Sequence, residues 1–102
     1  MRRIMVRYKV KPGQAARNTQ LVEAVYDELR RSGPAGFRYA TFRLDDGLTF
    51  VHLAVTETDD GSSPLSGNQA FQRFQEGIAD RCDEPPGAAE VHEVGSFRLF
   101  GD

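Results

Sequence analysis

The sequence predicts an α+β fold of order β-α-β-β-α-β, the ferredoxin-like arrangement, in which two helices cover one face of a four-stranded antiparallel sheet. Three observations predict it. The chain opens on an alternating segment, two segments with helical periodicity lie at residues 14–31 and 68–84, and an Asp46-Gly47 turn separates two further apolar segments. Right-handed crossovers then give the strand order fourth-first-third-second. We expect residues 1–102 to form a single domain.

The first predicted elements are a strand at residues 3–11 and a helix at residues 14–31. Apolar side chains alternate with polar ones in the strand, as in a pleated strand with two different faces. Pro12-Gly13 ends the strand, since proline donates no ladder hydrogen bond. Gly33-Pro34 ends the helix. The helix is predicted by a one-sided stripe that consists of Asn18, Leu21, Val22, Val25 and Leu29.

The second and third strands form a predicted hairpin around Asp46-Gly47, a pair that favours a type I′ turn. One face of this hairpin carries Ala40, Phe42, Leu44, Val51, Leu53 and Val55. The other face is mixed and carries Phe37, Tyr39, Thr41, Arg43, Leu48, Phe50, His52 and Ala54. We expect the helices to cover the first face. The mixed face is rich in aromatic residues, so we expect it to be buried against a second copy of the chain.

The rest of the chain is predicted as a loop, a helix and a final strand. Residues 58–67 are rich in glycine, serine and aspartate, which is typical of a mobile surface loop. The second helix begins near Asn68 and presents one apolar face of Phe71, Phe74, Ile78 and Cys82. It cannot continue beyond residue 84, because Pro85-Pro86-Gly87 follows. The last strand is expected at residues 89–100.

Charge and composition exclude several classes of partner. Acidic and basic residues are interspersed and the net charge is −2, so no basic stripe exists that would bind nucleic acid. No apolar segment has the length of a signal peptide or of a membrane span, so no membrane partner is expected. Cys82 is the only cysteine and cannot form an intrachain disulfide, which favours a reducing, cytoplasmic location.

His52 is the candidate catalytic residue. It lies in the middle of a predicted strand on the mixed face, with Tyr39, Thr41 and Arg43 on the neighbouring strand as candidate ligand-binding residues. A histidine on an aromatic face can orient a ligand or act as a general base near neutral pH. The other interpretation is a half-buried structural histidine that bonds to Thr41 or to a backbone carbonyl. The sequence leaves both open.

The remaining reactive residues indicate no metal or cofactor site. His92 is the only other histidine and lies on a different strand, where we expect it to be exposed. The two histidines lack the spacing of metal ligands, so no metal is predicted. Cys82 is predicted to be a buried structural cysteine. The glycines are dispersed and form no nucleotide-binding loop, so no cofactor is predicted.

Three segments of the sequence resemble one known superfamily. They are Tyr8-Lys9-Val10-Lys11-Pro12-Gly13-Gln14 before the first helix, Phe50-Val51-His52-Leu53 in the hairpin, and Phe71-Gln72-Arg73-Phe74-Gln75 in the second helix. Their order and pattern resemble the dimeric α+β barrel superfamily, which includes the antibiotic biosynthesis monooxygenase-like and stress-responsive barrel families. The resemblance spans nearly the whole chain.

This resemblance implies a homodimer whose two sheets pair face to face, with an aromatic or polyketide-like molecule bound between sheet and helices. Some members oxidise such substrates without metal or flavin. The leading hypothesis is therefore a small-molecule-binding barrel dimer, extending to a cofactor-independent monooxygenase-like protein with His52 as base. Characterised oxygenases of this kind commonly rely on a tryptophan, which this sequence lacks. The alternative is a non-catalytic, stress-associated or structural interaction dimer whose interior is simply packed.

Overall fold

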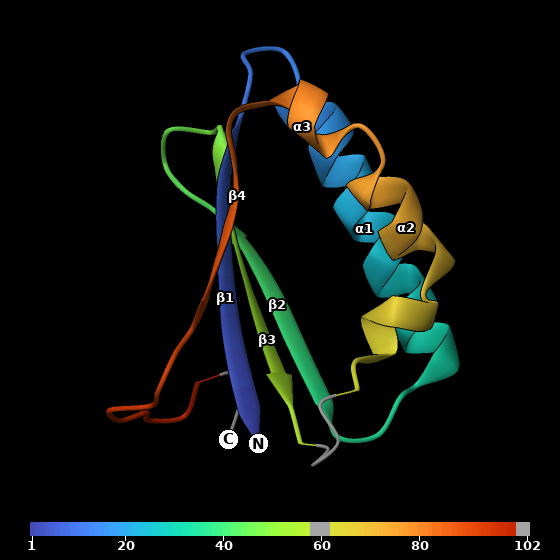
Figure 1. The fold of residues 1–102 in the computed structure, drawn as a ribbon, viewed down its shortest axis with the longest axis vertical. Coiled ribbons are helices and arrows are strands. Elements are labelled where there is room, and N and C mark those ends of the chain that lie inside the picture. The colour runs from blue at the N-terminus through green and yellow to red at the C-terminus, as the bar shows by residue number, and fades with distance from the viewer. Residues whose placement is uncertain (58–61, 100–102) are drawn as a thin grey trace.

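The computed structural model describes residues 1–57 and 62–99, which form one sheet with all its helices on one side (Figure 1). The strands are β1 (Arg2–Val10), β2 (Phe37–Arg43), β3 (Thr49–Thr56) and β4 (Cys82–Glu90). The helices are α1 (Ala15–Ser32), a 3₁₀ helix η1 (Pro64–Gly67), α2 (Gln69–Gln75) and α3 (Ile78–Arg81). The predicted α+β fold class is confirmed.

The sheet has the order β2-β3-β1-β4, and every neighbouring pair is antiparallel. This is the predicted fourth-first-third-second order, read from the other edge. The predicted hairpin register is also confirmed, since Phe42 pairs with Val51 and Thr41 pairs with His52. The turn differs from the type I′ prediction. Only Gly47 has a positive φ, and Asp46 instead accepts the backbone N–H groups of Leu48 and Thr49 through its carboxylate.

The prediction of which hairpin face the helices cover is wrong, and so is the expectation that a second copy of the chain buries the mixed face, because the helices of the same chain cover it. The core beneath the helices contains Phe50, which is 3% exposed, while Phe42 on the opposite face is 45% exposed. The pairing of β1 with β3 explains this outcome, because Tyr8 lies opposite Phe50 and brings its own buried side chain to the same face. The helix-free face carries the other set of side chains, which includes Met5, Ala40, Phe42, Val51, Leu53 and Val55 together with Arg3, Arg7 and Arg38.

The first helix ends as expected and the second does not form one continuous rod. Gly33 adopts the left-handed conformation at the end of α1 and donates to the carbonyl of Leu29. Gly77 has a φ of 71° and separates α2 from α3, so the predicted helix at 68–84 is broken there. The side chain of Asn68 caps α2 by accepting the N–H of Phe71. After the break, α3 leads directly into β4.

The last strand occupies Cys82–Glu90 rather than residues 89–100. Its prolines are accommodated because β4 is an edge strand, and its register against β1 shifts between Arg7 and Val10. The strand ends early because β1 begins at Arg2, so little of β1 remains to pair beyond Val91, whose N–H bonds to the carbonyl of Arg3. Phe97, expected in the strand, is exposed after its end.

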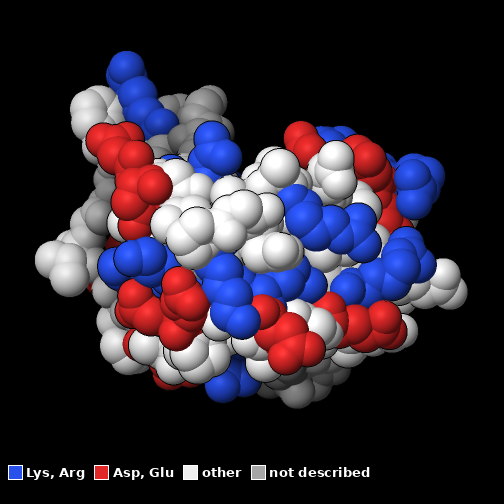
Figure 2. Space-filling model, turned by 90° about the horizontal axis from the view of Figure 1, so that it is seen from above, with Lys and Arg blue, Asp and Glu red and all other residues white. Residues whose placement is uncertain are grey.

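The predicted mobile loop at 58–67 falls partly on residues 58–61, which lie outside the described residues. Its described remainder contains η1, and Leu65 of η1 is buried in the core, so this part of the segment is anchored. On the face of the molecule shown in Figure 2, acidic and basic side chains are interspersed. Among the described helices, none is long and apolar enough to cross a membrane.

Candidate functional site

His52 lies at the centre of a set of buried hydroxyl groups. It is 4% exposed, and both of its ring nitrogens have partners. The Nε2 atom lies 2.8 Å from the hydroxyl oxygen of Tyr8. The Nδ1 atom lies 2.6 Å from the hydroxyl of Tyr39 and 3.1 Å from that of Thr41. Thr41 in turn lies 2.7 Å from the hydroxyl of Tyr26 on α1, so the histidine connects the sheet to the first helix.

The Tyr8 end of this set continues to a buried arginine. The side-chain Nδ2 of Asn18 donates to the Tyr8 hydroxyl at 2.8 Å, and Arg81 donates to Oδ1 of Asn18 at 3.3 Å. Asn18 is on the buried stripe of α1, and Arg81 is at the end of α3. We refer to the connected residues Arg81, Asn18, Tyr8, His52, Tyr39, Thr41 and Tyr26 as the polar chain.

Arg81 is held by the break between α2 and α3. Its guanidinium donates to the backbone carbonyls of Phe74 at 2.6 Å and Glu76 at 3.0 Å, two groups at the end of α2. It also lies 5.5 Å from the centroid of the Phe74 ring. The turn at Gly77 places α3 so that this arginine, 9% exposed, points back into the core. A buried cation at one end of the polar chain thus forms a hydrogen bond through each of its three nitrogens.

Burial sets the protonation states along the polar chain. It lowers the pKa of His52 to about 4, so the imidazole is neutral at pH 7. Burial also raises the pKa of the Tyr8 and Tyr39 hydroxyls, which therefore stay protonated. Arg81 is the one charged group in the polar chain, because a guanidinium remains protonated in proteins. The polar chain thus consists of neutral, hydrogen-bonded groups with a cation at one end.

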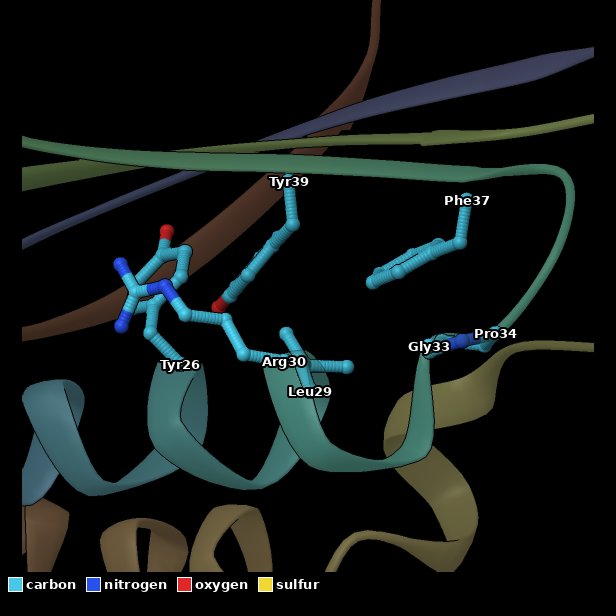
Figure 3. Close-up of a pocket in the computed structure, with 7 residues that line it drawn as sticks. All are labelled: Tyr26, Leu29, Arg30, Gly33, Pro34, Phe37 and Tyr39. Carbon is cyan, nitrogen blue, oxygen red and sulfur yellow. The ribbon is translucent and has the colours of Figure 1, made fainter.

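The other end of the polar chain borders a pocket of about 220 Å³ between α1 and β2. In Figure 3, the rings of Phe37 and Tyr39 extend from β2 toward the helix, and Tyr26, Leu29 and Arg30 extend from α1 toward the sheet. Tyr39 is stacked between Tyr26 and Phe37, with ring centroids at 5.3 and 5.6 Å. Gly33 and Pro34 complete the lining. The pocket therefore offers aromatic faces, two phenolic hydroxyls and one cation.

Three of the four residues singled out in the sequence come together, and one does not. His52, Tyr39 and Thr41 share the polar chain, but only Tyr39 of the three lines the pocket. Arg43 is exposed at the end of β2, where it borders a surface hollow formed by the consecutive hairpin residues 43–46. No contact among the described residues joins it to His52. Its predicted role in ligand binding stays a prediction.

The sequence reasoning missed the roles of Tyr8, Asn18 and Arg81. Asn18 had a signal, since it interrupts an otherwise apolar stripe on α1 and a buried amide there needs partners. Arg81 had none, because an unbroken second helix would have turned it away from the core. Cys82 is buried as predicted, although it begins β4 instead of ending a helix. His92 is exposed as predicted.

Comparison with known proteins identifies the fold. No protein-family model and no curated protein matches the chain. Solved structures do. A putative antibiotic biosynthesis monooxygenase from Nitrosomonas europaea aligns with a TM-score of 0.74 at 16% identity, covering 93% of this chain and 100% of that chain. Rv0793 from Mycobacterium tuberculosis aligns with a TM-score of 0.69 at 12% identity, covering 93% and 96%.

A variant of SnoaB, a cofactor-independent oxygenase from Streptomyces nogalater, aligns with a TM-score of 0.64 at 15% identity, covering 96% of this chain and 97% of that chain. The chain therefore has the fold of the antibiotic biosynthesis monooxygenase-like proteins, and the resemblance drawn from the sequence is confirmed at that level. Within the described residues, no group of three histidine, cysteine or carboxylate side chains is placed to hold a metal ion.

Proposed function

We propose that this protein binds a small aromatic molecule in the pocket between α1 and β2. The observation that carries this proposal is the joint presence of the stacked Tyr26 and Tyr39 rings and the Arg30 guanidinium around one hollow. Aromatic walls bind a planar apolar ring, and the hydroxyls and the cation bind an oxygen on that ring. A hydroxyarene combines both features.

The pocket volume limits the size of this ligand. Pockets for drug-sized molecules typically hold about 300–1,000 Å³. The pocket here, at about 220 Å³, is smaller and suits a ligand of one or two rings. A larger polyketide-like substrate would need the Tyr39 or Phe37 ring to move. We therefore propose a one- or two-ring hydroxyarene as the ligand class.

Calorimetric titration with 1-naphthol tests the proposal. We expect saturable binding of one molecule per chain. Arg30→Gln should weaken it about 5- to 10-fold, because a hydrogen bond to a charged group contributes about 1.5–3 kcal/mol when fully formed and less at an exposed site. Arg31→Gln is the matched control, since Arg31 is the next residue on α1 and does not line the pocket. Equal loss in both variants, or no binding at all, would refute the proposed site.

A second candidate function is oxygenation of the same ligand, which the structural likeness to SnoaB favours. A hydroxyarene with a free para C–H can react with one O₂ to give a quinone and one H₂O, so the substrate supplies the electrons. The pocket would bind the phenolate and exclude water. His52 reaches the pocket only through the Tyr39 hydroxyl, so we propose that it influences the ligand's proton through Tyr39. Oxygen consumption with 1-naphthol and no added cofactor tests this candidate.

We further propose that the protein is a homodimer that pairs through the helix-free face of the sheet. The helices leave Met5 39% exposed on the central strand β1, opposite Leu53 of β3, with Ala40 and the exposed Phe42 one strand further on β2. Arg3 and Arg7 flank Met5 on the same face. An exposed apolar strip of this kind is typical of an interface. If no ligand binds, a non-catalytic interaction dimer remains as the alternative. A cytoplasmic location belongs to the same proposal and is supported by the single, unpaired Cys82.

A further inference from the structure

The hydrogen bonds of the polar chain have only one consistent direction at its Arg81 end. An arginine side chain has donors and no acceptor, so the atom of Asn18 that faces Arg81 is the carbonyl oxygen Oδ1. The amide nitrogen of Asn18 therefore faces Tyr8 and donates to its hydroxyl oxygen. This orientation follows from the chemistry of arginine alone.

Tyr8 must then donate its own hydroxyl hydrogen to His52. The Tyr8 side chain is 1% exposed, and its hydroxyl has two partners, Asn18 and Nε2 of His52. Because Asn18 is a donor, only His52 can accept the Tyr8 hydrogen. If Nε2 carried a hydrogen instead, the Tyr8 hydroxyl hydrogen would be buried without an acceptor, which costs free energy. The neutral imidazole therefore carries its hydrogen on Nδ1.

The position of that hydrogen decides how many hydroxyl hydrogens remain for a ligand. The hydroxyl of Tyr39 is the one closest to Nδ1, at 2.6 Å, while Thr41 and Tyr26 form a hydrogen bond with each other. When Nδ1 of His52 is a donor, the Tyr39 oxygen accepts from it and the Tyr39 hydroxyl hydrogen is left over. When Nδ1 is an acceptor, it takes that hydrogen and none is left on Tyr39.

We infer that Arg81 is a positioning residue, which acts through Asn18 and Tyr8 to hold His52 as a donor and so leaves one tyrosine hydroxyl free to donate into the pocket. Tyr39 lines the pocket, so its spare hydrogen is available to a ligand there. The inference rests on the proposed pocket. It adds that the ligand must present a hydrogen-bond acceptor, such as a phenolate or carbonyl oxygen, at this wall.

Asn18→Asp is the substitution that reverses the direction of the hydrogen bonds in the polar chain between residue 18 and His52. A carboxylate has the size of the amide and has only acceptors, so one oxygen still accepts from Arg81 while the other accepts the Tyr8 hydroxyl hydrogen. Tyr8 then has no hydrogen for His52, so Nε2 becomes the donor and Nδ1 the acceptor. The spare hydroxyl hydrogen at the pocket is lost. Asn68→Asp is the matched control, because Asn68 is the only other asparagine, is equally buried and caps α2 away from His52.

Nitrogen-15 spectroscopy of the histidine rings tests the tautomer without any ligand. In the wild-type protein at pH 7, we expect Nδ1 of His52 to be protonated and Nε2 to be unprotonated. His92→Gln removes the signals of the other histidine. Asn18→Asp should exchange the two nitrogens, and Asn68→Asp should leave them unchanged. A wild-type spectrum with the hydrogen on Nε2 would overturn the inference, and this measurement needs no variant to fold.

Two probes of similar size test the consequence for ligands. Quinoline offers only an acceptor, and indole offers only a polar N–H donor. We expect Asn18→Asp to weaken quinoline binding about 5- to 10-fold and to leave indole binding unchanged or tighter, as the loss of one hydrogen bond predicts. Asn68→Asp should change neither. Equal effects on both probes would overturn the inference. Failure of both probes to bind any variant would refute the proposed pocket. The nitrogen-15 spectrum of His52 would still show which tautomer is present, so the two failures can be distinguished.

Discussion

The hydroxyl oxygen of Tyr39 lies 2.6 Å from Nδ1 of His52, so a side chain on the pocket wall and a histidine in the core form one hydrogen-bonded unit. This contact makes the chemistry at the pocket depend on groups that no ligand touches. It also places the neutral imidazole where its protonation would disturb the fold, which leads to the first prediction.

We predict that the protein loses stability as the pH falls from 6.5 to 4. Burial holds the pKa of His52 near 4 in the folded chain, against an ordinary value of 6.5. The unfolded chain therefore binds a proton first, and stability is fully present above pH 6.5 and decreases below it. Once His52 is protonated in the folded chain as well, the free energy of unfolding has fallen by roughly 3 kcal/mol. Urea unfolding at a series of pH values measures it.

The same series in two variants assigns the effect to His52. His52→Gln should remove most of the pH dependence in this window, at the cost of a lower stability at pH 7. His92→Gln should retain the wild-type dependence, because His92 is exposed after the end of β4. An unchanged slope in His52→Gln would show that another group controls the acid sensitivity.

Arg81→Met should destabilise the fold by about 2–4 kcal/mol. The substitution removes the donors for the carbonyls of Phe74 and Glu76 and leaves Asn18 Oδ1 without its partner, and each unsatisfied buried group costs about 1–3 kcal/mol. Arg73→Met is the control, because Arg73 is exposed on α2 and a surface change there should stay within about 0.5 kcal/mol. Denaturant midpoints compare the two. Similar midpoints would mean that Arg81 contributes little to the core.

Met5→Glu should convert a dimer into monomers while leaving each chain folded. The side chain lies in the middle of the helix-free face, so the proposed interface would bury two like charges between its apolar side chains, which costs free energy. Light scattering and circular dichroism measure mass and fold together. Gln72→Glu on the exposed side of α2 should stay dimeric. Phe50→Asp should instead unfold the chain, because Phe50 belongs to the core under the helices. A wild-type monomer would contradict the dimer proposal.

The order of the elements was predictable because each is marked locally. Gly33 closes α1, and the Asp46-Gly47 pair sets the hairpin register even though the turn type differs. The covered face was not predictable from the hairpin alone. Both hairpin faces carry apolar side chains, and only the pairing of Tyr8 with Phe50 decides between them. That pairing joins residues far apart in the sequence.

The candidate site was predictable only in part, for the same physical reason. His52, Tyr39 and Thr41 were found because they are neighbours across one hairpin. Arg81 was missed because its burial depends on the left-handed backbone at Gly77, which no local pattern marks as a break. The pocket itself forms between α1 and β2 and is defined by their packing, so no motif in either segment indicates it.

The place where a hydroxyarene binds decides whether the pocket between α1 and β2 is the binding site. Titration of nitrogen-15-labelled protein with 1-naphthol, followed through the backbone amide signals, maps where the molecule binds. We predict that the largest shifts occur at Gly33, Phe37 and Tyr39, with smaller ones along the adjoining turn of α1. The largest shifts in the hairpin hollow at residues 43–46, or on the helix-free face around Met5 and Leu53, would contradict it.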